Sequence, residues 1–236
     1  MKKISIVIPA LYEHENVSNL FKKLDIIIKK NNQYFFDVLL VDGIELQKDT
    51  KLLCDEFSYK YLNRVSYEFF GDAIRTGFKN VEGDSSWVVV LDADGSHDPE
   101  FIDNFIIAAE QDPELDVIIA SRYIPGGSTD NNIFLIYLSK IVNIIYRVFF
   151  NLKIYDVSNN FRMYKYSRLK NLELSENNFE VVEEILIKLF HNFENLKVLE
   201  IPFRFQKRIS GKSRRKLLPF AITFVSSILR LKKYGK

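Results

Sequence analysis

An unbroken apolar run, Trp87 to Leu91, stops abruptly at two aspartates, Asp92 and Asp94. Such a run is typical of a strand that is covered on both faces, as in a parallel sheet flanked by helices. In open sheets of this kind, the ligand crevice lies beyond the carboxyl ends of the strands. Residues i and i+2 of a strand point the same way, so both carboxylates can face one hard cation whose other partners are phosphates. The run therefore predicts a site for a metal-bound nucleoside diphosphate.

A simpler interpretation of the same segment is an acidic turn that caps a helix beginning near Pro99. Asp98, directly before this proline, is typical of a helix N-cap. The cap explains Asp98 but leaves the pair of Asp92 and Asp94 without a reason.

Strand and helix patterns alternate over residues 1–120. This alternation predicts an α/β fold with a mainly parallel central sheet and helices on both faces, and we read this half as nucleotide-binding. The expected strands are 4–8, 36–41, 64–69, 87–91 and 117–121, and the expected helices are 15–30, 49–61, 72–80 and 99–111.

The pattern changes after Gly126 and Gly127. We expect residues 121–216 to hold the acceptor, so that residues 1–216 form one catalytic domain and 217–236 form a basic, amphipathic helix. The second half is expected to contain a long apolar helix over 134–152, a polar loop over 155–161, a helix over 180–190 and a strand over 197–205.

The formal net charge is only +2, but basic residues crowd into residues 204–216 and 230–236. Local basic clusters indicate phosphate or an anionic membrane surface rather than a protein that coats nucleic acid. The single cysteine, Cys54, excludes an internal disulfide, suits the cytoplasm, and is expected to be a small buried residue on a helix. We see no secretory leader and no apolar run of the roughly 18 residues that span a bilayer. We therefore expect a cytoplasmic protein, peripheral on the membrane.

The C-terminal segment places apolar residues at helical spacing between basic margins. Such a helix can lie on an anionic membrane surface, or the same stripe can pack on the domain, and the pattern alone leaves both open. The stripe consists of Leu217, Phe220, Phe224, Ile228 and Leu231.

Taken together, the motifs resemble glycosyltransferase family 2, and more narrowly its dolichyl-phosphate mannose synthase-like, polyprenyl-phosphate branch. The resemblance covers about residues 4–216 and implies the GT-A fold of nucleotide-diphospho-sugar transferases. Each motif is weak alone, but their order and spacing are specific. The motifs are 7–9 with Glu13, Glu15 and Asn16, then 41–42, 92–97, 121–123, 126–127, Asp156, Ser158, 161–162, 179–180, Arg208 and 211–214.

The resemblance implies a role for each matching position. Asp92 and Asp94 would hold Mg²⁺ or Mn²⁺ against the diphosphate of GDP-mannose or a UDP-sugar, and the cation would offset charge on the leaving group. Arg122 would meet the acceptor phosphate, with Ser139 and Lys140 as weaker candidates. The remaining nucleotide-sugar residues would be Pro9, Leu11, Glu13, Asp42, Ala93, Arg208 and Arg214.

Most of these positions also have simpler interpretations. Glu13 could be a helix-start residue, Asp42 a turn residue, and the basic loop around Arg208 only solvated surface or a lipid contact. Arg122 could form an ion pair with Asp116 or Asp130.

The chemistry of the acceptor decides whether a base is needed. A phosphomonoester has a second pKa of about 6 and attacks without a strong base, whereas a sugar hydroxyl requires a carboxylate within reach. Asp156 and Glu183 are the candidates for that base, although Asp156 could instead orient Arg162 or cap a turn. His97 is expected to support the site or start a helix.

Several positions depart from the family pattern and concern the identity of the nucleotide. In this chain, Leu11 stands where the family usually has an aromatic residue, Tyr12 where it has asparagine, and Gly43 where it has a second aspartate. Residues 69–72 stand where the family has a Gly-Leu-Gly loop.

The leading hypothesis is an inverting transferase that moves one sugar from a nucleotide sugar to a polyprenyl phosphate at the membrane. Alternatives are a family 2 enzyme that acts on a glycan hydroxyl, a phosphohydrolase with two aspartates, and a degenerate nucleotide-binding subunit. The phosphohydrolase is disfavoured because Gly95 stands where that class carries a hydroxyl side chain. Whether a membrane-anchoring subunit holds the chain at the membrane stays open.

Overall fold

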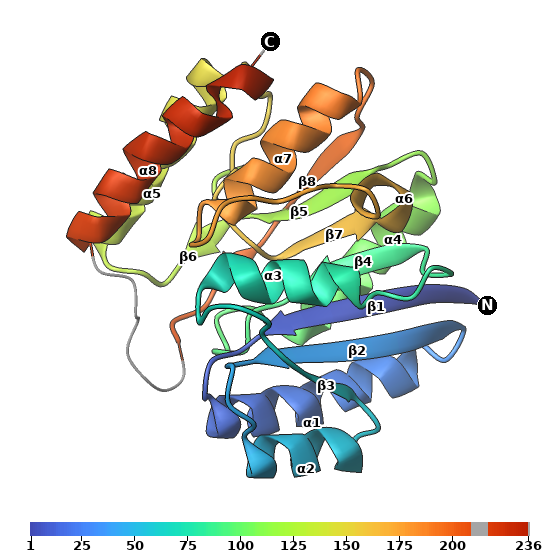
Figure 1. The fold of residues 1–236 in the computed structure, drawn as a ribbon. Helices are drawn as coiled ribbons and strands as arrows, with labels where there is room; N and C mark the ends of the chain where they lie inside the picture. Colours follow the sequence, from blue (N-terminus) through green and yellow to red (C-terminus); the bar gives the residue numbers. More distant parts are fainter. Residues whose placement is uncertain (209–216, 236) are drawn as a thin grey trace.

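The computed structural model describes residues 1–208 and 217–235, and residues 217–222 only as backbone. Its centre is a seven-stranded sheet in the order β3-β2-β1-β4-β7-β5-β8 (Figure 1). Every neighbouring pair is parallel except the two that β7 forms. The sheet strands are β1 (Lys2–Pro9), β2 (Tyr34–Asp42), β3 (Lys60–Asn63), β4 (Trp87–Val90), β5 (Val117–Ser121), β7 (Arg162–Lys165) and β8 (Val198–Pro202).

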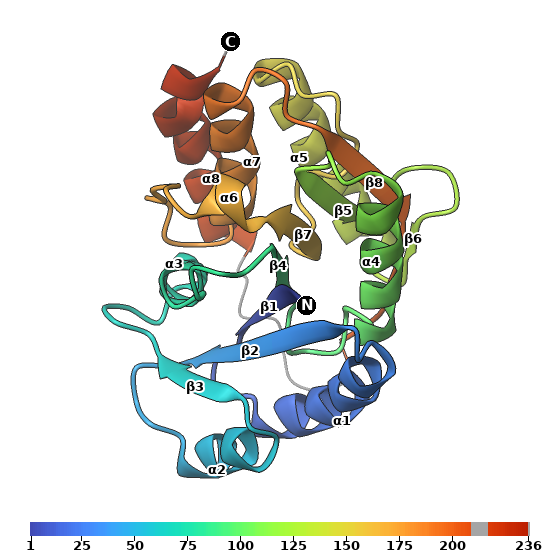
Figure 2. The same cartoon turned by 90° about the vertical axis from the view of Figure 1, so that its right-hand side faces the viewer.

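Helices cover both faces of the sheet, and a small parallel ribbon pairs β6 (Ser128–Thr129) with β9 (Arg204–Phe205). Figure 2 shows β2 and β3 separating α3 from α1 and α2. The helices are α1 (His14–Lys30), α2 (Lys48–Glu56), α3 (Phe70–Lys79), α4 (Ile102–Gln111), α5 (Ile133–Phe149), α6 (Tyr166–Leu169), α7 (Val181–Asn192) and α8 (Leu217–Leu231), with short 3₁₀ turns η1 (Pro99–Phe101) and η2 (Lys232–Tyr234). The expected α/β fold with a mainly parallel sheet is confirmed.

Alternation along each strand divides the core into two layers. In β1, Ile6 and Ile8 face α1, α2 and α4, whereas Val7 faces the layer of α3, α5, α7 and α8. Cys54 on α2 is fully buried in the first layer, and burial raises the pKa of its thiol to about 12. It is therefore the small buried residue that the sequence predicts.

The largest differences between the expected and the observed elements concern the region of β3, the strand over 197–205 and β7, and the short β6 and α6 were not expected either. The helix expected over 49–61 ends at Glu56, and β3 follows at Lys60, while residues 64–69 are irregular. The expected strand over 197–205 is interrupted at Phe203, because its second part leaves the sheet to pair with β6. The antiparallel β7 has no counterpart among the expected strands.

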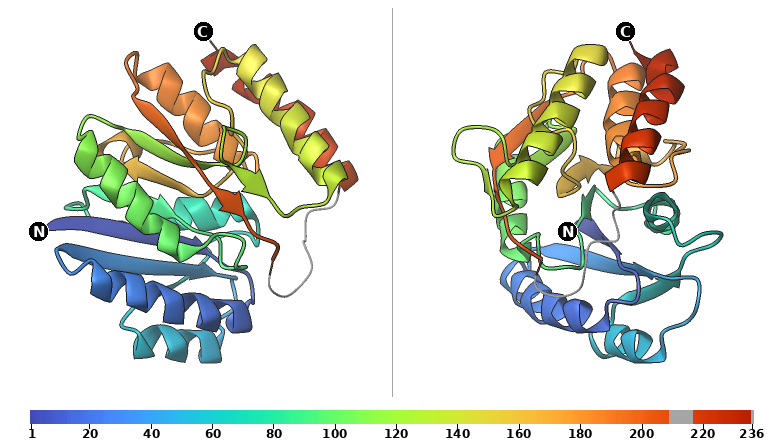
Figure 3. Two further views of the ribbon diagram at one scale, coloured as in Figure 1. Left: turned by 180° about the vertical axis from the view of Figure 1, so that it is seen from behind. Right: turned by 90° about the vertical axis from the view of Figure 1, so that its left-hand side faces the viewer.

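The described part of the apolar stripe of α8, from Phe224 onward, packs on the domain instead of facing outward. Phe224, Ile228 and Leu231 are buried, and the Phe224 ring meets Tyr146 of α5 at a centroid distance of 5.2 Å. The Tyr146 hydroxyl also lies 2.8 Å from Ser227 Oγ, so α8 lies along α5 (Figure 3, left). Among the described residues, no helix combines the length and the apolar character needed to cross a bilayer.

Candidate active site

Asp92 and Asp94 lie just beyond the carboxyl end of β4, beside the end of β1. These two strands pair in parallel, with Val7 opposite Val90, and the chain order reverses between them. A reversal of this kind opens a crevice at the carboxyl edge of the sheet. Ala93 is buried between the two aspartates, whose own side chains are 25% and 16% exposed and so within reach of an ion.

Asp94 is held as a carboxylate by local contacts. Its Oδ1 accepts hydrogen bonds from the backbone N–H and the hydroxyl of Ser96, at 2.9 and 2.6 Å, and Oδ2 lies 2.9 Å from Arg208 Nε. Burial would raise the pKa of Asp94, but the bonds from Ser96 and the charge of Arg208 outweigh it and lower this pKa. Asp94 is therefore ionised at neutral pH.

Asp92 is positioned through its backbone as well as its side chain. Its N–H donates to His97 Nδ1 at 3.0 Å, and its Oδ1 accepts from Asn160 Nδ2 at 3.0 Å. Because Nδ1 is the acceptor, the imidazole proton is on Nε2, which lies 3.2 Å from Asn159 Oδ1. Burial, together with the neighbouring charge of Asp94, raises the pKa of Asp92.

Arg122 follows β5 and forms a buried, two-pronged ion pair with Asp156. Its Nε and Nη2 donate to the two carboxylate oxygens at 2.8 and 2.7 Å, and its backbone N–H adds a third bond at 2.9 Å. Burial would raise the pKa of Asp156, but the charge and hydrogen bonds of Arg122 outweigh it and lower this pKa. The ion pairs considered from sequence are formed with other partners: Asp116 binds Arg168, and Asp130 binds Arg204.

A group of small polar side chains surrounds the guanidinium of Arg122. Ser158 Oγ accepts from Arg122 Nη2 at 2.8 Å and lies 3.1 Å from Ser139 Oγ on α5. Lys140, the next residue of α5, lies with its ammonium 5.8 Å from the centre of the Tyr123 ring, and the guanidinium lies 4.9 Å from the same ring. These side chains join the acceptor candidates into one cluster.

One segment, residues 155–161, connects the two aspartates to the arginine. Because β7 is antiparallel, the loop that enters it lies at the same edge as the ends of β4 and β5. Within this loop Asp156 binds Arg122, Asn159 meets His97, and Asn160 binds Asp92. The structure therefore brings both halves of the predicted site to one edge.

The sequence pattern did not identify the residues that hold this segment. Glu200 of β8 accepts hydrogen bonds from the backbone N–H groups of Tyr155 and Asp156, at 2.7 and 2.9 Å. The available signals were a glutamate within an otherwise apolar strand and two adjacent asparagines, Asn159 and Asn160, inside a loop. Neither signal identifies its partner.

The positions expected to bind the nucleotide line the ends of β1 and β2. Pro9 ends β1, and Leu11 follows it at an intermediate exposure. Glu13 precedes α1 and holds Asn16 Nδ2 at 2.9 Å. Asp42 is fully buried, and its Oδ1 accepts from the N–H groups of Tyr12 and Gly43, both at 2.8 Å.

Two of the family departures prove to be coupled in space. Tyr12 has a left-handed backbone conformation, with φ of 57°, and its ring lies over Gly43. A Cβ atom at position 43 would approach the Tyr12 ring to 2.4 Å. The ring therefore occupies the space that a side chain at 43 would need.

Of the two arginines expected to approach the diphosphate, the structure describes only Arg208. Arg208 bonds Asp94, and its Nη2 lies 3.8 Å from Glu13 Oε1, so it bridges the aspartates and the end of β1. Arg214 lies outside the described residues.

Asp98 caps η1 by accepting from the N–H of Glu100 at 3.2 Å, as the sequence predicts.

The donor set suits a hard divalent cation such as Mg²⁺ or Mn²⁺. Asp92 and Asp94 supply carboxylate oxygens, and Asn160 Oδ1 is buried beside them without a hydrogen-bond partner in the described chain. Within residues 1–208 and 217–235, no cluster of three histidine, cysteine or acidic side chains could hold a metal alone. Phosphate oxygens from a bound nucleotide would supply the remaining ligands.

Comparison with known proteins decides the family. The family model Glycosyl transferase family 2 matches residues 5–172. The chain belongs to this family. The match includes most of β1, both aspartates, Arg122 and the whole segment 155–161, whereas Glu200 and Arg208 lie beyond it.

The curated relatives include three enzymes named for polyprenyl phosphates. Dolichol-phosphate mannosyltransferase of Pyrococcus furiosus is 31% identical over 221 residues, covering 91% of this chain and 59% of that protein. Polyprenol monophosphomannose synthase of Mycolicibacterium smegmatis is 27% identical, covering 89% and 79%. Undecaprenyl-phosphate mannosyltransferase of Micrococcus luteus is 24% identical, covering 90% and 87%. The chain thus spans about three-fifths of the length of the first of these relatives.

Solved structures support the GT-A architecture. Glucosyl-3-phosphoglycerate synthase from Mycobacterium tuberculosis, with Mn²⁺, UDP-glucose and glycerol 3-phosphate, superposes with a TM-score of 0.72 at 13% identity, covering 99% of this chain and 80% of that one. The same enzyme with Mg²⁺ and UDP gives 0.72 at 13% identity, covering 99% and 79%. At this identity the likeness concerns the fold.

Proposed function

We propose that this chain is a metal-dependent, inverting glycosyltransferase that moves a sugar from a nucleotide sugar to a polyprenyl phosphate. Mannose is the first candidate for the sugar, because the three relatives above are mannosyltransferases by name. A GDP-sugar or a UDP-sugar would be the donor.

The contact between Ser158 and Ser139 is the observation that favours a lipid phosphate as the acceptor. It joins the buried Arg122 cluster directly to α5, whose outer face is apolar and exposed. A cationic group beside an apolar helix suits a phosphate on a long hydrocarbon chain better than it suits a polar glycan. The acceptor phosphate would meet Arg122 while the prenyl chain follows α5.

The donor half would be organised by the residues at the ends of β1 and β4. Asp92 and Asp94 would hold Mg²⁺ or Mn²⁺, which neutralises charge on the departing nucleoside diphosphate. Arg208, which pairs with Asp94, would also bind the same phosphates. Asp42, Glu13 and Pro9 would line the base and ribose.

The acceptor half needs positioning more than proton removal. A phosphomonoester is largely dianionic at neutral pH, so one of its oxygens can attack the anomeric carbon directly. The bond from that carbon to the nucleoside diphosphate breaks as the new bond forms, and an α-linked donor gives a β-linked product. Asp156, with a lowered pKa and both oxygens bonded to Arg122, would orient this arginine.

A binding screen followed by product analysis tests the proposal. We expect one nucleotide among GDP-, UDP- and dTDP-sugars to raise the melting temperature only when Mn²⁺ is present, because ligands that bind the folded state stabilise it. With that donor, a polyprenyl phosphate should be glycosylated and free saccharides should not. Transfer to a saccharide hydroxyl would overturn the acceptor assignment, and binding without turnover on any acceptor would point to a degenerate subunit.

The outer face of α5 would contact the membrane that carries the prenyl substrate. Phe134, Tyr137, Ile141, Ile144 and Val148 recur at helical spacing and are 53–79% exposed. Contiguous exposed apolar surface of this kind marks an interaction site. The exposed Lys140 on this helix and Lys232 and Lys233 after α8 favour an anionic bilayer as the partner.

Vesicle sedimentation tests this contact. Replacing Ile144 and Val148 by serine should weaken binding to phosphatidylglycerol vesicles at least tenfold, because each buried apolar side chain contributes about 1.5–3 kcal/mol. The matched control is serine at Ile26 and Ile107, which are equally exposed on α1 and α4 and should leave binding unchanged. Unaltered binding of the α5 variant would overturn the proposal, and loss of a dimer on gel filtration would assign the face to a second copy.

A further inference from the structure

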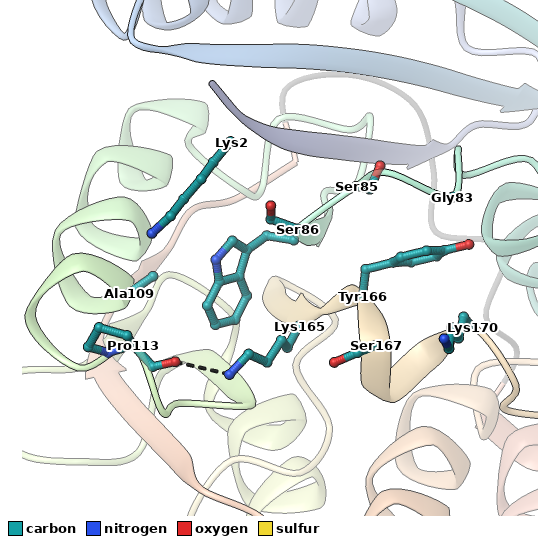
Figure 4. A pocket seen from close by; sticks show the side chains of 11 residues that line it. Lys2, Gly83, Ser85, Ser86, Ala109, Pro113, Lys165, Tyr166, Ser167 and Lys170 are labelled. Atoms are coloured by element: carbon teal, nitrogen blue, oxygen red, sulfur yellow. Dashed lines mark hydrogen bonds between the residues drawn. The ribbon is translucent and has the colours of Figure 1, made fainter.

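A second cavity lies at the end of the sheet opposite the two aspartates. It is partly open to solvent and has a volume of about 390 Å³ between the starts of β1 and β4, the end of β7 and the start of α6 (Figure 4). Trp87 begins β4 and lines this cavity, whereas Asp92 follows the other end of the strand. At about 3.3 Å per residue, the two positions are roughly 16 Å apart. The cavity therefore shares no residue with the site described above.

The charge of the cavity is entirely positive. Lys2, Lys165 and Lys170 line it, and no carboxylate does. Lys165 donates to the carbonyl oxygen of Pro113 at 3.0 Å, and none of the three lysines forms an ion pair with any described residue. Glu110 lines a smaller adjoining hollow and accepts a hydrogen bond from the Tyr34 hydroxyl, and Glu82 and Asp84, which flank Gly83 in the chain, form ion pairs with Lys3. A site with three uncompensated ammonium groups favours an anion.

The arrangement of these lysines fixes where the anion would lie. Figure 4 shows Lys2, from β1, and Lys165, from β7, extending toward the side formed by Ala109 and Pro113. Lys165 is paired across the sheet with Trp87, so its side chain starts beside the indole. Lys170 lies at the far end, beyond Tyr166. The negative group would therefore meet Lys2 and Lys165.

The remaining walls indicate that the ligand has an organic body. Trp87, Ala109, Pro113 and Tyr166 supply apolar and aromatic surface, and serine hydroxyls from Ser85, Ser86 and Ser167 complete the lining. Cavities that bind small molecules start at about 300 Å³ and combine mostly apolar walls with a few polar groups. An inorganic anion alone would fill only a small part of this space.

We propose that this cavity is a second binding site, for a small organic anion with an apolar or aromatic body, anchored by Lys2 and Lys165 beside Trp87. The site is separate from the transferase crevice and does not depend on the function proposed there.

Tryptophan fluorescence provides a selective test, because Trp87 is the only tryptophan in the chain. Titration with phenyl phosphate should change the Trp87 emission in a saturable way. Lys2→Met and Lys165→Met keep most of the side-chain length but remove the charge, and each should weaken the apparent affinity at least tenfold. Lys23→Met, an exposed lysine on α1, is the matched control and should bind like the original chain.

Three further arms make the result decisive. Inorganic phosphate and phenol should each bind at least tenfold more weakly than phenyl phosphate, since each lacks half of the expected contacts. Arg208→Met should bind phenyl phosphate normally, since it removes a positive charge only from the distant crevice. Equal affinities in the original chain and both lysine variants would overturn the site. Loss of the response in Arg208→Met would assign the probe to the transferase crevice, and equal binding of inorganic phosphate would overturn the ligand class.

Discussion

Asp94→Asn should lose sugar transfer by about a thousandfold or more while the protein stays folded. Asparagine keeps a carbonyl oxygen for Ser96 but removes the charge that faces Arg208 and that we propose for the cation. A metal ion stabilises the departing diphosphate by several kcal/mol, and each 1.36 kcal/mol is a factor of ten in rate. The measurements are the transfer rate at saturating donor and the Mn²⁺-dependent rise in melting temperature on adding nucleotide, and both should disappear.

Asp98→Asn is the matched control for this experiment. Asp98 lies four residues further along the same acidic segment, but it caps η1 and accepts a bond from Gln206 Nε2 at 3.2 Å. Weakening this cap should lower stability by no more than about 1 kcal/mol and change the transfer rate by less than about threefold. Full activity of Asp94→Asn with added metal would remove Asp94 from the metal site.

Asp156→Asn should destabilise the protein by about 3–5 kcal/mol, because it leaves the buried guanidinium of Arg122 without its counter-charge. Chemical denaturation measures this loss. The lowered pKa of Asp156 adds a pH signature. The contribution of this carboxylate is complete above the ordinary aspartate pKa of about 4 and is lost as pH falls through the lower value of the folded state. The variant should lack that part of the acid dependence.

Kinetics of the same variant separate positioning from base catalysis. If Asp156 orients Arg122, the KM for the prenyl phosphate rises and the pH dependence of kcat keeps its shape. A kcat lowered by a factor of 100 or more, with loss of its alkaline plateau, would instead identify Asp156 as the general base. Asp130→Asn breaks the exposed pair with Arg204 and should cost about 1 kcal/mol or less.

The sequence predicted the fold wherever local pattern and tertiary position agree. The alternation of strands and helices up to Ser121 predicted the parallel sheet, although β3 lies at Lys60–Asn63 and not at the expected 64–69. β7 was missed because it has only four residues, two of them basic, and its strand character comes from pairing with β4 and β5 on both sides. Pairing across distant segments leaves no periodic signal in a short stretch.

The sequence predicted most residues of the candidate site but not the contacts between them. Asp92 and Asp94 stand out because an apolar strand ends at them. The sequence did not single out Asp156 as the partner of Arg122, because Asp156 lies 34 residues away and several other acidic residues are as near in sequence. The roles of Asn160 and Glu200 depend on the direction of β7, which the pattern did not reveal.

The packing of Tyr12 on Gly43 couples the residues that these two positions can accept. A carboxylate introduced at 43 alone meets the Tyr12 ring, whereas a smaller residue at 12 frees that space and keeps the backbone N–H that donates to Asp42. Substitutions that interact so directly are not additive. We therefore expect an aspartate at position 43 to be accommodated better when a small residue replaces Tyr12 than when it is introduced alone, so a redesign of this end of the sheet has to change both residues together.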